Sequence, residues 1–428
     1  MVALFKDSPE YEARKKATFT PPNITIKDVH AAVPKHLFQR STSKAVFYVV
    51  RHLSIAVALF VFATKIDSIV HHVAASYELP SRAVTALSYA MWSFYWLWES
   101  VTFTGVWTLG HECGHDALAG SNMANAVLGM IMHTFMLTPY YAWRATHRSH
   151  HKGTNSLARD ETYHPPSRED FHLPEEHIAR PMDYHELVEE TPLYTLYKML
   201  IRQFLGFQLY LIHNRKGNPK YPPWTSHYNP NAQLFRPEER HLIAISDVAM
   251  AIMVGLLGLW IHTTSFNNVW RLYFVPWLFA HSWIVTITYL QHSDPTVPYY
   301  RNQWTFLRGA LATVDRPMFG WVGRFFWHGI AHDHVAHHFF VTVPFYNLPQ
   351  VTEAIKPVLG EYYYYDTTPT FYALWRSFTQ CKFIESKGDI VFFKNQQGKA
   401  VREDITDGSH VAPPAPALQE EKIDVLSN

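Results

Sequence analysis

The chain of 428 residues is poor in cysteine and has no excess of charge of either sign. Cys113 and Cys381 are its only cysteines, too few for the disulfide framework of a small secreted domain. The 37 basic residues nearly balance the 36 acidic ones, so no polybasic field points to nucleic acid as a partner. No apolar core of a cleavable signal peptide follows the basic N-terminus, and we find no internal repeat.

Four long apolar runs dominate the hydropathy pattern. A helix needs about 20 apolar residues to cross a bilayer, so the runs predict an all-α, multi-span membrane protein with about four transmembrane helices. The runs cover residues 45–64, 83–110, 242–261 and 272–290. They leave a polar N-terminal arm (1–44), a helical cap (111–241 and 291–402) and a tail (403–428) whose APPAPA sequence predicts disorder.

Basic residues around the runs predict the orientation. The arm before the first run has eight Lys or Arg, whereas the short loops at the other ends of the runs hold only Lys65, Arg82 and Arg271. By the positive-inside rule, the arm, the cap and both termini are cytosolic. The apolar segment 126–142 would break this scheme if it crossed the bilayer. Its 17 residues, with Pro139 near one end, instead favour a re-entrant or interfacial segment.

The sequence contains three short histidine clusters. HECGH directly follows the second run, HRSHH lies in the loop after that run, and HVAHH comes after the fourth run. Spacings of three and four residues place the imidazoles of each cluster on one face of a helix. The clusters contain His111, His115, His147, His150, His151, His334, His337 and His338. Clustered imidazoles are costly near a bilayer unless they bind something, and imidazole binds transition metals well. Eight nitrogen donors exceed the need of one tetrahedral zinc and suit two metal ions, which predicts a membrane metalloenzyme.

Two other functions compete with this prediction. HECGH also fits the HExxH pattern of zinc metalloproteases, with Glu112 as general base, but that interpretation leaves two clusters without a purpose, and Gly114 weakens the required helix. A histidine-rich membrane metal transporter would place ligating groups within the spans, whereas these clusters lie beyond them.

The sequence resembles the membrane-bound fatty-acid desaturases, specifically the delta-12/omega-3 acyl-lipid branch of fungi and plants. The resemblance covers about residues 20–365 and includes the three histidine boxes with their flanking segments. These segments are TGVW at 104–107, WRATHRSHH at 143–151, SLARDE at 156–161, SHYNP at 226–230, TYLQH at 288–292, RGALATVDR at 308–316 and HHFFVTVPFYN at 337–347. The chain departs from many relatives at 116–119, after the first box, and at Pro317 and Met318, which leaves substrate choice and regiochemistry open.

The resemblance implies a di-iron site on the cytosolic face, held by the eight box histidines. It also implies a ninth ligand, His292, because related desaturases have a histidine at the cytosolic end of the fourth span. Asp160, Glu161 and His332 are candidates for orienting the ligand imidazoles, as metal-bound histidines usually require.

The activity implied by the resemblance is O2-dependent desaturation of a fatty acyl chain in a lipid of the endoplasmic reticulum membrane. The branch favours delta-12 desaturation of oleoyl to linoleoyl. Cytochrome b5 and NADH–cytochrome b5 reductase would supply the electrons as separate proteins, because the chain has no HPGG-type haem motif. The same scaffold supports omega-3 desaturation, hydroxylation, conjugation and triple-bond formation, and the sequence leaves these alternatives open.

Overall fold

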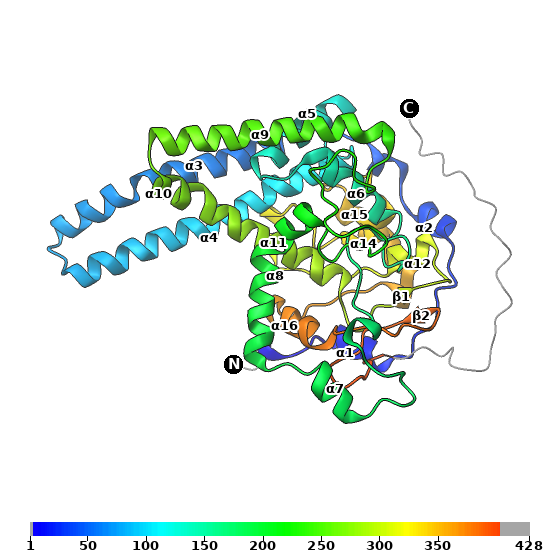
Figure 1. Ribbon diagram of the computed structural model, residues 1–428. Helices are drawn as coiled ribbons and strands as arrows, with labels where there is room; N and C mark the ends of the chain where they lie inside the picture. Colours follow the sequence, from blue (N-terminus) through cyan, green and yellow to red (C-terminus); the bar gives the residue numbers. More distant parts are fainter. Residues whose placement is uncertain (1–2, 403–428) are drawn as a thin grey trace.

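The computed structural model describes residues 3–402, so the tail predicted over 403–428 lies outside the described residues. The described chain is mostly helical, as predicted. Its two short strands, β1 (Tyr299–Tyr300) and β2 (Ile390–Val391), pair in an antiparallel sheet. Figure 1 shows a stem of long helices that projects from a head of shorter helices and loops.

The stem contains four long helices at the positions of the four apolar runs. These helices are α3 (Thr42–Ser76), α4 (Ser81–Gly114), α9 (Arg240–Thr263) and α11 (Val275–His292). α3 and α4 form an extended hairpin, and α11 packs against α4. The short α10 (Phe266–Val269) leads into α11 through a π-helical turn at Trp270–Phe274.

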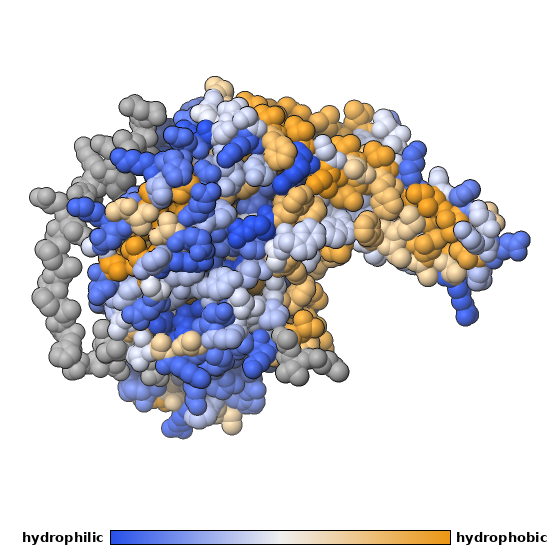
Figure 2. All heavy atoms as spheres, turned by 180° about the vertical axis from the view of Figure 1, so that it is seen from behind, coloured by the Kyte–Doolittle hydropathy of each residue, from blue (hydrophilic) through white to orange (hydrophobic). Residues whose placement is uncertain are grey.

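Two stem segments, Thr42–Ser76 and Pro237–Thr263, are long and apolar enough to cross a membrane by length and composition. Most of their side chains lie on the surface of the protein. α4 and α11 bury polar side chains such as Glu99, Thr104 and Thr286, so their composition is less uniformly apolar. Figure 2 shows an apolar band on the stem between the polar head and the more polar tip of the hairpin.

The segment predicted as re-entrant or interfacial forms a helical hairpin beside α4. α5 (Asn122–Phe135) runs back along α4, and the His133 ring lies 3.1 Å from the Trp107 carbonyl oxygen. The chain turns before Tyr140, and α6 (Tyr140–His151) returns to the C-terminal end of α4. The first two histidine boxes therefore lie at the same end of the stem.

The head is formed by residues 3–41, 115–239 and 293–402, and it covers the C-terminal ends of α4 and α11. Besides the hairpin of α5 and α6, its α-helices are α1 (Pro9–Lys16), α2 (Ile26–Ala32), α7 (Pro181–Leu187), α8 (Pro192–His213), α12 (Phe306–Leu311), α13 (Trp321–Phe326), α14 (His334–Phe339), α15 (Leu348–Leu359) and α16 (Thr370–Gln380). Short 3-10 helices cover Ala3–Phe5, Lys35–Phe38, Glu169–Phe171, Pro237–Glu239 and Gly360–Tyr362. The predicted N-terminal arm packs onto the head, where Tyr11, Phe19 and Val29 are buried.

Gly105 allows α4 to approach both α3 and the head. A Cβ at this position would overlap the carbonyl oxygen of Phe326 and the ring of His52. We predict that Gly105→Ala lowers the melting temperature of the purified protein, because a backbone carbonyl cannot easily move aside and overpacking costs about 1–3 kcal/mol.

Gly255→Ala in α9 is the matched control. A Cβ at Gly255 meets open space, and alanine is a better helix former than glycine, so its melting temperature should stay equal or rise. Equal melting temperatures for the two variants would contradict the close packing at Gly105.

Candidate metal centre

Four helix ends bring nine histidines together at the junction of stem and head. α4, α6 and α14 each present one of the three boxes, and α11 ends at His292. The nine are those named from the sequence: His111, His115, His147, His150, His151, His292, His334, His337 and His338. Eight of them are buried and His147 is half-buried. The spacing within each box predicted that its rings share one helix face, and the expected placement of the three boxes on one side predicted that they can meet. His292 was expected only from the resemblance.

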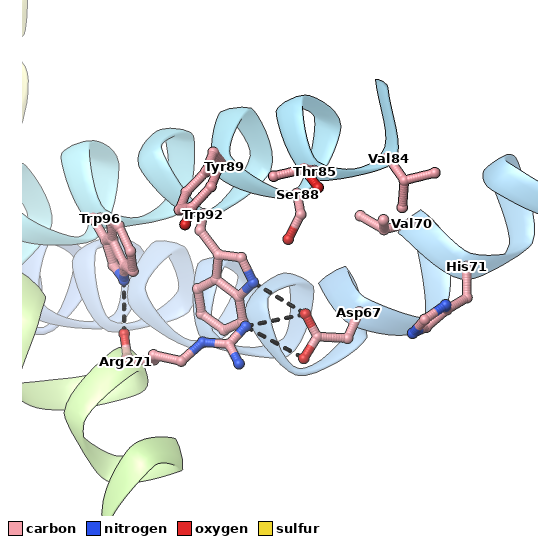
Figure 3. Close-up of a pocket in the computed structure, with 10 residues that line it drawn as sticks. All are labelled: Asp67, Val70, His71, Val84, Thr85, Ser88, Tyr89, Trp92, Trp96 and Arg271. Atoms are coloured by element: carbon pink, nitrogen blue, oxygen red, sulfur yellow. Dashed lines mark hydrogen bonds and ion pairs between the residues drawn. The ribbon is translucent and has the colours of Figure 1, made fainter. Parts of the chain in front are cut away.

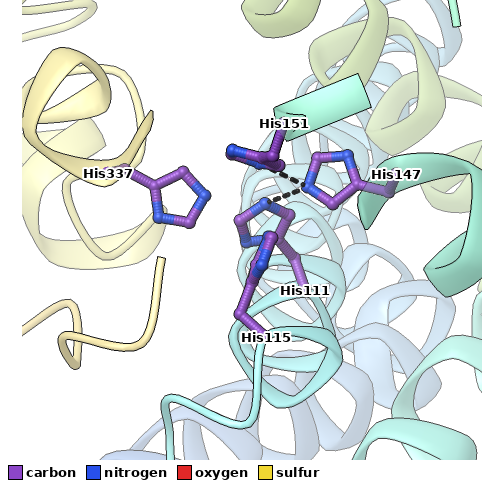
Figure 4. A group of neighbouring side chains, drawn as sticks. All are labelled: His111, His115, His147, His151 and His337. Atoms are coloured by element: carbon purple, nitrogen blue, oxygen red, sulfur yellow. Dashed lines mark hydrogen bonds between the residues drawn. The ribbon is translucent and has the colours of Figure 1, made fainter. Parts of the chain in front are cut away.

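The first group of imidazoles comes from three helices. Its ligand atoms all lie within 4.8 Å of one another, and Figure 4 shows the rings facing a common centre. The group consists of His111, His115, His147, His151 and His337. The Nε2 atom of His147 lies 2.9 Å from that of His111 and 3.1 Å from that of His151.

The second group lies directly beside the first. The ligand atoms of His150, His292 and His338 also lie within 4.8 Å of one another. His334 joins them, because its Nε2 atom lies 3.2 Å from that of His292 and 3.1 Å from that of His338. The stacked rings of His151 and His338, with centroids 4.1 Å apart, connect the two groups.

Hydrogen bonds behind the rings fix which nitrogen faces the centre. His150 Nδ1 lies 2.9 Å from an Asp160 carboxylate oxygen and therefore donates to it. His338 Nδ1 lies 3.2 Å from the Thr154 hydroxyl oxygen, whose own proton is donated to the His150 carbonyl. A neutral imidazole carries one N–H. The Nε2 atoms of His150 and His338 therefore present lone pairs to the cluster.

The electrostatics of the cluster fit bound metal ions. Burial lowers the pKa of His337 to about 3, and it lowers the pKa of His115 well below its usual value. These two rings are thus neutral at pH 7, which is the form that binds a metal. Imidazole nitrogens that face one another at about 3 Å either share a proton or, when both present lone pairs, coordinate a cation between them. Two adjacent all-nitrogen groups suit two transition-metal ions.

Glu112 is not positioned like the general base of an HExxH metalloprotease. Its carboxylate oxygen lies 3.1 Å from His111 Nδ1, and its side chain is buried. His111 and His115 also share their group with histidines of other helices, so they do not form an isolated HExxH site. Glu112 instead fixes the orientation of the His111 ring.

Asp160 is the one sequence-predicted orienting residue that is hydrogen-bonded to a box histidine. Its carboxylate also accepts hydrogen bonds from the backbone N–H groups of Asn155 and Thr162. Glu161 pairs with Lys220 at 2.8 Å. The ring of His332 lies 3.0 Å from the carbonyl oxygen of Gly320, and its contact leads away from the cluster.

A cluster that we call the Asp116 clamp (Asp116, Arg144 and Arg148) joins the first two boxes. The Nε atoms of both arginines donate to the Gly114 carbonyl, at 3.0 and 2.9 Å. Their Nη2 atoms donate to the same Asp116 oxygen, at 2.8 and 2.6 Å. Asp116 has a left-handed backbone with φ of 56°. The sequence singled out this position only as a departure from relatives, because nothing local links it to α6.

Buried acids hold the other two helix ends. Asp315 accepts hydrogen bonds from the backbone N–H of Val335 in α14 and from the Tyr363 hydroxyl, and burial raises the pKa of Asp315 to about 8. Beyond His292, Asp294 pairs with Arg316 at 2.6 Å. These acids come from separate loops. Asp315 lies within the RGALATVDR segment of the resemblance, which gave it no role, and no motif in the sequence pointed to Asp294.

Comparison with known proteins agrees with this geometry. The sequence profile of the family described as Fatty acid desaturase matches residues 90–370. The chain is 40% identical to the delta(12) fatty acid desaturase of Mortierella alpina over 380 residues, covering 87% of this chain and 91% of that protein. It is 34% identical to the oleate hydroxylase of Claviceps purpurea over 407 residues, covering 88% and 82%. It is 35% identical to the omega-6 fatty acid desaturase, endoplasmic reticulum, of Brassica juncea over 379 residues, covering 88% and 91%. The chain therefore belongs to the fatty acid desaturase family of oxidoreductases.

Proposed function

We propose that the protein is a delta-12 acyl-lipid desaturase that converts oleoyl to linoleoyl chains at a di-iron centre. The observation that carries the proposal is the pair of adjacent, buried, all-nitrogen histidine groups. The likeness to a delta(12) desaturase supports the position of the new double bond. The likeness to an oleate hydroxylase makes hydroxylation the second candidate.

The nine histidines would hold the two iron ions, five in the first group and four in the second. With dioxygen, two electrons and two protons, the bound irons would remove one hydrogen from each of two neighbouring methylenes and leave a cis double bond and two waters. The protein contributes the alignment of the histidine rings and the exclusion of water from the centre. Trp143 stacks on His147 with ring centroids 4.5 Å apart, and burial of the surrounding side chains excludes bulk water.

We place α3, α4, α9 and α11 across the endoplasmic reticulum bilayer, with the head and both termini in the cytosol. The apolar band of the stem and the eight basic residues of the arm support this placement. α8 carries exposed Leu193, Tyr197 and Leu200 beside the stem, which suits a helix lying in the interface. Electrons would reach the cytosolic head from cytochrome b5 and its NADH-dependent reductase.

Fatty-acid analysis tests the reaction. A yeast that lacks diunsaturated lipids and expresses this chain should accumulate 18:2 with double bonds at positions 9 and 12, measured by mass spectrometry. Detection of a hydroxylated fatty acid instead of 18:2 would change the assigned reaction from desaturation to hydroxylation at the same centre. An absence of any modified chain from membranes that contain the iron-loaded protein would contradict both.

Removal of one second-group donor tests the metal assignment. His292→Ala should abolish activity and lower the iron content of the purified protein. The Nε2 atoms of His150 and His334 lie beside that of His292 and would hold the same metal ion less well without it. His177→Ala is the control, since that side chain is 73% exposed, and it should retain both. Full iron content in His292→Ala, measured by inductively coupled plasma mass spectrometry, would remove His292 from the site.

The neighbours Asp160 and Glu161 form a matched pair. Asp160→Asn keeps the size of the side chain but weakens the hydrogen bond to His150, so activity or iron affinity should fall about 10–100-fold. Glu161→Gln should change either quantity little, because its pair with Lys220 lies at the edge of the head. Similar losses for the two variants would show that Asp160 has no special role.

A further inference from the structure

A cavity of about 500 Å³ opens in the stem, far from the histidines. It lies between α3, α4 and the π-helical turn before α11, and Figure 3 shows the side chains around it. Its polar and aromatic lining is formed by Asp67, Ser88, Tyr89, Trp92, Trp96 and Arg271. The volume lies within the range of about 300–1,000 Å³ that is typical of small-molecule sites.

One cation and one anion are held in fixed positions in this cavity. Arg271 Nη2 donates to Asp67 at 3.0 Å, and the guanidinium lies over the Trp92 ring, 3.7 Å from its centre. Trp92 Nε1 donates to the same carboxylate at 3.1 Å, and Trp96 Nε1 donates to the Arg271 carbonyl at 2.9 Å. The Asp67 side chain is 59% exposed, so its carboxylate remains accessible to a ligand.

This set of groups is complementary to a zwitterion that carries a phosphate and a quaternary ammonium. Arginine guanidinium groups bind phosphate oxygens in a geometry that suits both. Quaternary ammonium groups bind to aromatic faces and to carboxylates. Trp92 lies next to Asp67, with Arg271 over its ring, and Tyr89 lines the same cavity from α4. The cavity therefore offers partners for both ends of a phosphocholine group.

The depth of the cavity matches the position of a lipid headgroup. The 19 residues from Trp92 to His111 belong to one helix, α4, and correspond to about 28 Å at 1.5 Å per residue. The hydrocarbon core of a bilayer is about 30 Å thick. If the metal centre lies at one membrane surface, the cavity lies at the other. Beyond it the hairpin carries His72, Glu78 and Arg82, which suit an aqueous surrounding.

We propose that this cavity binds the headgroup of a phosphatidylcholine molecule in the leaflet opposite the metal centre. The proposal rests on the proposed placement of the stem across the membrane. The lipid would be separate from the acyl lipid that reacts. It would contact α3, α4 and the segment leading into α11, whose other end carries His292, and so would stabilise the arrangement of these helices.

Native mass spectrometry of the full-length protein in detergent tests this site. The probe is dihexanoyl phosphatidylcholine, and dihexanoyl phosphatidylglycerol is the comparison because it has the phosphate without the quaternary ammonium. The wild type should retain phosphatidylcholine in preference to phosphatidylglycerol. Arg271→Gln should reduce the retained fraction of phosphatidylcholine about tenfold, as expected for one lost charge-assisted hydrogen bond. Arg82→Gln, a cation near the same end that does not line the cavity, should leave retention unchanged.

A second variant keeps the test valid if Arg271→Gln unfolds. Ser88→Trp fills the cavity and leaves the ion pair of Asp67 and Arg271 intact, and it should also lose phosphatidylcholine. Equal retention of the two lipids, or unchanged retention in Ser88→Trp, would overturn the proposal. Iron content and 18:2 formation, measured on the same preparations, report separately on the metal centre, so failure of the lipid site is distinguishable from failure of the desaturase assignment.

Discussion

The convergence of nine buried or half-buried imidazoles at four helix ends is the constraint on which the rest of the structure depends. Neutral rings with Nε2 atoms about 3 Å apart must either share protons or coordinate cations between them. The head holds the four helix ends that bring these rings together. The Asp116 clamp joins α4 to α6, Asp315 holds the start of α14, and Asp294 anchors the chain just beyond α11. Each contact fixes the direction of a helix end.

The stem combines apolar outer surfaces, which suit contact with lipid, with polar side chains that face other helices. α3 and the segment containing α9 expose apolar side chains and carry no box histidine. α4 and α11 end in metal-centre residues, and they turn Thr104, Thr108 and Thr286 inward. Polar groups within a membrane are tolerated where they face other helices. This difference between the two pairs of helices explains why only two segments have the composition of a typical membrane span, although four long helices form the stem.

Local sequence patterns predicted the helices and the histidine faces, because both follow from the geometry of a single helix. The length of 126–142 and Pro139 predicted a re-entrant or interfacial segment, and in the structure the chain turns back there between α5 and α6. The supporting contacts could not be predicted in this way. Asp315 meets Val335 and Tyr363 across separate loops. The choice between Asp160 and Glu161 depends on the backbone of one turn, which neighbouring residues with the same chemistry do not specify.

The two departures from relatives now have different physical meanings. Asp116 contacts the helix of the second box, so this position acts on the alignment of the box histidines. Pro317 and Met318 line a cavity of about 860 Å³ together with Phe319 and Phe371, so they alter the wall of an apolar space and touch no ligand. Desaturases and hydroxylases both occur among the relatives at similar identity. The departure at Pro317 and Met318 therefore changes the wall of this cavity and leaves the nine histidines unchanged.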